Sequence, residues 1–108
     1  MAFSNYLSNE ILDHVFSGNA FTAPSNYYVA LYTVAPTASG GGTEVTGGGY
    51  VRRAATFTTS ATQSTNQSAV EFPTATAAYG NVVAAAVLDA TSGGNLLAFA
   101  NLTAAKNI

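Results

Sequence analysis

Charged side chains are scarce in this chain, and the scarcity limits the surroundings in which it can fold and stay dissolved. Three basic and five acidic residues stand among 108, or 7%, whereas about 25% is usual for a soluble domain. A folded monomer of this length exposes about 5,600 Å², so each charge would serve about 700 Å² of surface. Soluble monomers usually carry more charge. The sequence therefore predicts a surface that copies of the chain or neighbouring proteins cover.

Other features of the composition exclude several kinds of partner. The longest uninterrupted apolar run, 82–88, is too short to cross a membrane. The formal net charge is −2, and the basic residues cluster only as Arg52–Arg53, so attraction to nucleic acid or anionic lipid is weak. Cysteine is absent, which excludes disulfides and thiolate metal sites. We expect a single domain over 1–108, with no nucleic-acid or membrane partner and no classical secretion signal.

Residues 1–18 have the spacing of an amphipathic helix. Ser4 or Asn5 could cap its start, and Gly18 lies where a helix often ends. An isolated helix of about twelve residues is marginal in water, so this one is expected to dock on its own domain or on a partner. Its apolar stripe repeats at every fourth position, with Phe3, Leu7, Ile11 and Val15, and Leu12 and Phe16 join it.

The segment 26–102 is typical of short β-strands separated by loops that are rich in glycine, proline and serine. We interpret 35–49, with its two glycine triplets, and the polar stretch 59–68 as loops. These features predict a mainly β fold, a small antiparallel β-sandwich or partial barrel with one N-terminal α-helix. The five predicted strands are 27–34, 50–58, 69–72, 81–90 and 95–102.

Residues with catalytic or metal-binding chemistry are few. Glu10, Asp13 and His14 share one face of the predicted helix, so a metal site or a general base can be considered. No fourth ligand and no nucleophile accompany them, and the glycine triplets lack the GK[ST] of a phosphate-binding loop. A solvated helix face is the preferred interpretation. We expect no catalytic residue, no cofactor and no metal ion, and hence no enzyme.

Three stretches carry a resemblance to a known family. They are MAFSNYLSNEILDHVFSG, then YYVALYTVAPT followed by EVTGGGYVRRA, and finally VEFPTATAAYGNVVAAAVLDATSGGNLLAFANLT. In this order they are similar to small virion proteins of tailed bacteriophages, usually labelled phage tail fibre proteins. The resemblance implies a non-enzymatic structural subunit of the virion, made in the bacterial cytoplasm and repeated many times. Its partners would be copies of itself and other virion proteins, in a tail, a fibre or a capsid-decorating layer.

The chain departs from the family pattern at two places. Members usually continue beyond the last block with one or two further strands, whereas this chain stops at Ile108, so we expect a short member or one that lacks C-terminal strands. Ala84–Ala86 replaces bulkier apolar residues of the relatives. Small side chains there would allow closer packing of the sheet, or form a shallow surface for a neighbour.

The family pattern also bears on the two arginines. Adjacent strand residues point to opposite faces, so at most one of them faces a given partner. Arg52 matches the family's GGGYxR, and we expect it to pair with Glu71 or Asp89. Arg53 stands where relatives are apolar and is interpreted as a contact between subunits.

Assembly through poorly charged faces is the first functional hypothesis. A carbohydrate- or receptor-binding module of a tail fibre, using tyrosines to stack on a host-surface glycan, is the alternative. Because the tyrosines lie in predicted strands and not in loops, the sequence favours packing. The predicted assembly interface consists of Phe3, Leu7, Ile11, Val15, Tyr28, Tyr32 and Arg53.

Overall fold

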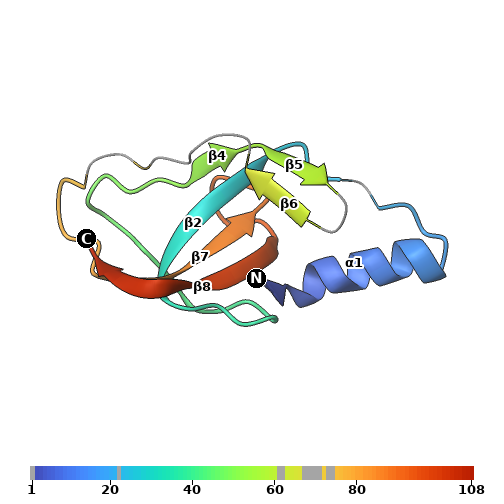
Figure 1. Ribbon diagram of the computed structural model, residues 1–108, viewed down its shortest axis with the longest axis horizontal. Helices are drawn as coiled ribbons and strands as arrows, with labels where there is room; N and C mark the ends of the chain where they lie inside the picture. Colours follow the sequence, from blue (N-terminus) through green and yellow to red (C-terminus); the bar gives the residue numbers. More distant parts are fainter. Residues whose placement is uncertain (1, 22, 61–62, 67–71, 73–74) are drawn as a thin grey trace.

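The protein consists of an antiparallel sheet and one helix that extends from its side (Figure 1). The computed structural model describes residues 2–21, 23–60, 63–66, 72 and 75–108. The elements in chain order are β1 (Ala2–Phe3), α1 (Asn5–Phe16), β2 (Tyr27–Val34), β3 (Thr43–Glu44), β4 (Arg53–Ala55), β5 (Phe57–Ser60), β6 (Gln63–Asn66), β7 (Asn81–Leu88) and β8 (Leu96–Asn107).

Strand β2 has paired strands on both of its edges in the main sheet. The strand order is β1-β8-β7-β2-β3, and β4 also pairs with β2. Strands β3 and β4 share one edge of β2, since β4 pairs with its first half and β3 with its second. The hairpin β5–β6 forms a separate two-stranded sheet. The predicted mainly β fold with one N-terminal helix is confirmed, and the main sheet does not close into a barrel.

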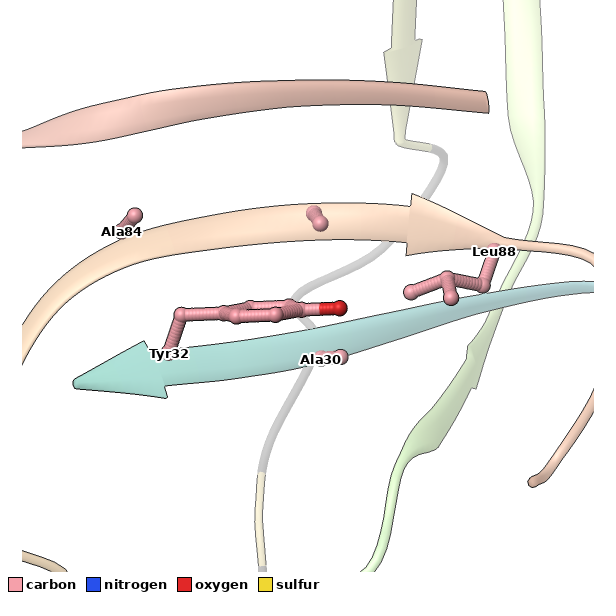
Figure 2. Packing of buried hydrophobic residues seen from close by; sticks show 5 residues of the cluster. Ala30, Tyr32, Ala84 and Leu88 are labelled. Carbon is pink, nitrogen blue, oxygen red and sulfur yellow. The ribbon is translucent and has the colours of Figure 1, made fainter. Parts of the chain in front are cut away.

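The main core cluster lies between β2 and β7, where small and large side chains face each other. Ala30 pairs with Ala86, and Tyr32 pairs with Ala84. Side chains alternate between the two faces of a strand, and every second residue of β7 from Val82 onward is buried. Figure 2 shows the Tyr32 ring lying along the sheet beside these alanines. The small residues of β7 therefore allow close packing within the chain.

A second buried cluster covers the glycine-rich part of the molecule. It consists of Val45, Tyr79 and Val82, with Tyr50 packed against it. The Tyr50 and Tyr79 rings meet edge to face with centroids 5.7 Å apart, a favoured aromatic geometry. The backbone around 45–50 is thus part of the folded body.

The prediction that 35–49 is a loop without regular structure was wrong in part. Strand β3 pairs with the second half of β2, and Val45 is buried. At Gly42 the φ angle is +75°, and an added Cβ would lie 2.6 Å from the carbonyl oxygen of Val34. Only glycine fits such a close approach in this conformation. The first triplet thus brings the chain close to the backbone of β2.

The prediction that the polar stretch 59–68 is a loop was also wrong, because much of this stretch belongs to the hairpin β5–β6. The single strand predicted over 50–58 is divided between β4 and β5. A polar hairpin lacks the alternation that marks a half-buried strand, although threonine favours extended structure. The predicted strand 69–72 lies largely outside the described residues, and Phe72 belongs to no strand.

Most of the remaining predicted elements agree with the structure. The first strand agrees over its whole length, and the last two exist as β7 and β8. The helix is shorter than predicted, because Ser4 adopts an extended conformation as its N-cap. Phe3 belongs instead to β1, where it pairs with Ala98 of β8. Gly18 follows the helix with a φ of 74°, as expected for a helix end.

Candidate functional site

Among the described residues, the hydrogen bonds that join α1 to the sheet and to Ala38 come from its N-cap and first turn. The Ser4 hydroxyl accepts from the Leu7 N–H at 3.1 Å and donates to the carbonyl oxygen of Leu96. The Ser4 N–H donates to the Leu97 carbonyl at 2.9 Å, and the Asn5 N–H donates to that of Ala38 at 2.7 Å. From this anchored start the helix runs outward, and its far end projects away from the sheet (Figure 1).

The projecting part of α1 presents an exposed apolar surface. None of the helix residues is buried, and the exposed fraction is 54% for Leu12, 62% for Val15 and 80% for Phe16. The molecule exposes 6,707 Å², more than the roughly 5,600 Å² expected for a compact monomer of its mass. We call Leu12, Val15 and Phe16 the helix stripe.

The residues predicted for an assembly interface are divided between helix α1 and the strands of the main sheet. Leu7, Ile11 and Val15 lie on α1, the first two half-buried, and Phe3 is 54% exposed in β1. The other three lie in the sheet: Tyr28 is half-buried in β2, Arg53 is exposed in β4, and Tyr32 is only 6% exposed. Tyr32 therefore offers little surface to another protein. The sequence placed Leu12 and Phe16 in the same apolar stripe, but they were not predicted as interface residues.

The structure gives Arg52 a different partner from those predicted. Its Nε lies 2.8 Å from Oε2 of Glu44, and its Nη2 lies 2.8 Å from Oε1. Glu71 lies outside the described residues, and the Asp89 carboxylate instead accepts from Asn95. The prediction failed at Asp89 because that carboxylate closes its own hairpin loop, with the Asn95 N–H at 2.7 Å.

Arg52 ties three segments together. Its remaining terminal nitrogen, Nη1, donates to the carbonyl oxygens of Ala90 at 2.9 Å and Gly93 at 2.8 Å. The side chain is only 7% exposed. A guanidinium that binds a carboxylate through two bonds holds a fixed geometry. The arginine therefore joins β3 and its own segment to the loop between β7 and β8.

Tyr50 extends this cluster to strand β2. Its hydroxyl donates to Oε2 of Glu44 at 2.7 Å and accepts from the Leu31 N–H at 3.0 Å. The hydrogen bond from Arg52 lowers the pKa of Glu44, while burial and the bond to Glu44 raise the pKa of Tyr50. Glu44 is thus ionised and Tyr50 protonated at neutral pH. We call Glu44, Tyr50 and Arg52 the arginine cluster. The polar atoms of these side chains form hydrogen bonds within the protein, so the cluster holds separate segments of the fold together.

The acid–histidine group of the helix has no comparable organisation. Asp13 and His14 are exposed, and the His14 Nδ1 lies 2.9 Å from the carbonyl oxygen of Asn19 just beyond the helix. Within the described residues, no three or more His, Asp or Glu side chains gather as metal ligands would. The described helix is also too short to span a bilayer.

Comparison with known proteins identifies one family that this chain matches. Among curated proteins, none matches the chain. A family model described as "Podophage GP4 fiber I protein gp80" matches residues 2–108. The match spans the helix and every strand, including the arginine cluster. The chain therefore belongs to this family of podophage fibre proteins, structural components of the virion.

Proposed function

We propose that the protein is a non-enzymatic fibre subunit that assembles with copies of itself through the helix stripe. The observation that carries this proposal is the exposure of Leu12, Val15 and Phe16 on a helix whose start is hydrogen-bonded to the sheet. Exposed apolar patches on soluble proteins mark interaction sites. Family membership supports the virion as the place of assembly.

The distribution of charge on α1 favours copies of the same helix as the occupant. Glu10 and His14 lie on the side opposite the stripe, and Asp13 lies at its edge beside Phe16, since residues three to four apart share a face. Two or more stripes can therefore meet with Asp13 in water at the rim of the contact, so that no ionised group is buried at a cost of several kcal/mol. The helix is about 18 Å long and marginal alone. Repetition within a particle would supply the avidity that one contact lacks.

Light scattering coupled to size-exclusion chromatography tests the proposal on the purified protein. At rising concentration the natural chain should form a defined oligomer, whereas the double variant Leu12→Ser/Phe16→Ser should stay monomeric. Burial of each of these side chains contributes about 1.5–3 kcal/mol, so together they would weaken association at least a hundredfold.

The matched control is Glu10→Ser/His14→Ser, which changes the same number of positions on the opposite side of the helix. It should assemble as the natural chain does. Circular dichroism should show that all three proteins keep the same fold. A natural chain that stays monomeric at every concentration would contradict the proposal, as would a double variant with an unchanged oligomer.

A further inference from the structure

The two faces of the main sheet differ in what covers them. One face carries the main core cluster and, between Tyr32, Leu88 and the base of α1, a cavity of about 400 Å³. The other face is apolar as well, since the run 82–88 of β7 contains no polar side chain. In an antiparallel sheet with one face in water, apolar and polar residues alternate along each strand. The composition of β7 therefore indicates a sheet that is covered on both faces.

The strand register places five side chains in one row across this second face. Phe3 of β1 pairs with Ala98 of β8, which pairs with Val87 of β7. Val87 pairs in turn with Val29 of β2, and Val29 with Arg53 of β4. Directly paired residues have their side chains on the same face, and neighbouring strands lie about 4.8 Å apart, so the row is about 19 Å long. We call Phe3, Ala98, Val87, Val29 and Arg53 the outer row.

The outer row is open at both ends and only partly covered between them. Phe3 is 54% exposed, Arg53 is exposed, and Val29 and Val87 are half-buried. Within the described part of the chain, Arg53 has no ion-pair partner. Neighbouring apolar side chains that remain in contact with water mark an interaction surface.

Other parts of the same chain limit the size of this surface. The Phe57 ring packs edge to face on Tyr27 with centroids 5.8 Å apart, so the hairpin β5–β6 bounds the surface at this end of β2. In the other direction, the half-buried pair Ala85 and Ala100 extends it. The surface is thus smaller than the roughly 800 Å² that each partner of a standard interface contributes. A single contact through it is expected to be weak.

The two ends of the outer row complement each other. Arg53 supplies a cation and Phe3 an aromatic ring, two groups that attract. If two copies meet face to face about a two-fold axis parallel to the strands, each Arg53 lies against Phe3 of the other copy, and Val87 meets Val87. An axis along the row would instead place Arg53 against Arg53, and like charges repel. The charge on the row therefore favours the first arrangement.

We propose that the outer row binds the outer row of a second copy of this chain in that two-fold arrangement. The same patch serves both subunits, as in other two-fold interfaces, and the two sheets would pack about 10 Å apart. This surface is separate from the helix stripe, and the proposal does not depend on assembly through the stripe. Because the contact is weak, it adds most where copies are already held close together.

Disulfide trapping detects such a weak contact, and the chain has no cysteine of its own. Every protein in the experiment carries Leu12→Ser/Phe16→Ser, so that the helix stripe does not bring copies together. Under mild oxidation, Val87→Cys should form a covalent dimer, since position 87 lies at the axis. The matched control is Val51→Cys, outside the row. Val51 is 52% exposed whereas Val87 is half-buried, so random collisions would favour the control.

A mixture of two variants tests the orientation of the copies. Phe3→Cys mixed with Arg53→Cys should give mainly the disulfide between the two different variants and little of either self-linked dimer. Adding Arg53→Gln to Val87→Cys should slow trapping about tenfold, because both cation–π contacts of the dimer are lost. Adding Arg53→Lys, which keeps the cation, should slow it less.

The proposal is overturned if Val87→Cys dimerises no faster than Val51→Cys, or if the self-linked dimer of Arg53→Cys predominates. Trapping of Val87→Cys that occurs only with the natural helix stripe would overturn it as well, because the stripe of a neighbour would then be the occupant of this face. Circular dichroism of the reduced variants checks their folding. If Val87→Cys folds poorly, the mixture of Phe3→Cys with Arg53→Cys decides the question, since both of those positions are exposed.

Discussion

The arginine cluster and helix α1 differ in where they place charged and apolar side chains. In the cluster, the nearly buried Arg52 contacts Glu44 and two backbone carbonyls. Along α1, apolar side chains such as Phe16 face outward and none is buried. The fold thus encloses an ion pair and exposes hydrophobic surface, the reverse of the usual distribution.

This contrast indicates that the arginine cluster stabilises the fold and that the helix stripe is available for association. Removing one partner of a buried ion pair leaves an uncompensated charge, so the pair resists change. The helix stripe contributes nothing to the core of its own chain, so it is free to meet another. We expect substitutions in the cluster to unfold the protein and substitutions on the stripe to change only its association.

The largest effect is expected from Arg52→Ala. It leaves Glu44 without its cation and frees the carbonyl groups of Ala90 and Gly93, so the free energy of unfolding should fall by about 3 kcal/mol. Urea denaturation followed by circular dichroism measures this loss. The control Arg53→Ala removes an exposed charge from the adjacent residue and should stay within about 0.5 kcal/mol of the natural chain. Equal losses in both variants would show that the cluster has no special role.

A smaller effect is expected from Glu44→Gln, about 1.5 kcal/mol at neutral pH, because hydrogen bonds to a charged group become bonds to a neutral one. The pKa of Glu44 is lowered from its ordinary value of 4.5. The ionised form is thus favoured by folding, and its contribution is complete above that ordinary value. It is lost as the pH falls through the lower folded-state value.

The pH dependence of unfolding separates this contribution from those of other carboxylates. Between neutral pH and acid, the natural chain should lose more stability than Glu44→Gln does. Parallel curves for the two proteins would show that another carboxylate carries the acid sensitivity.

The smallest effect is expected at the joint between the two regions. Ser4→Ala removes the hydroxyl that caps α1 and bonds to Leu96, and the loss of an N-cap costs about 1 kcal/mol. Helix content from circular dichroism should fall, while the amide signals of β7 keep their positions. Ser17→Ala, at the exposed far end of the helix, should have no such effect. A cooperative loss of the sheet in Ser4→Ala would show that helix and sheet fold as one unit.

The elements with strong local signals were predictable. Strand β2 is rich in aromatic and β-branched residues, and the spacing of Leu7, Ile11 and Val15 indicates a helix directly. The hairpin β5–β6 was missed because its Thr, Ser and Gln side chains show no apolar alternation. Strand β3 has only two residues, too few to give any pattern.

The partner of Arg52 and the cavity below α1 could not be predicted for a different reason. Glu44 precedes Arg52 by eight residues, but the turn between them contains Gly47, Gly48 and Gly49, each with positive φ. Such a backbone makes the distance between two side chains impossible to infer from their spacing. The cavity joins Tyr6, Tyr32 and Asn95, which are brought together by the pairing of β1 with β8, β8 with β7 and β7 with β2.

The sequence by itself determined the fold class, the helix with its apolar stripe and the membership in a phage fibre family, because these depend on local periodicity and on motifs kept in order. Tertiary structure alone decided that Tyr32 is buried, that Glu44 holds Arg52 and that the stripe remains uncovered. The first two depend on strand register, and the third depends on where the start of α1 is anchored. Both are set by contacts between residues far apart in the chain.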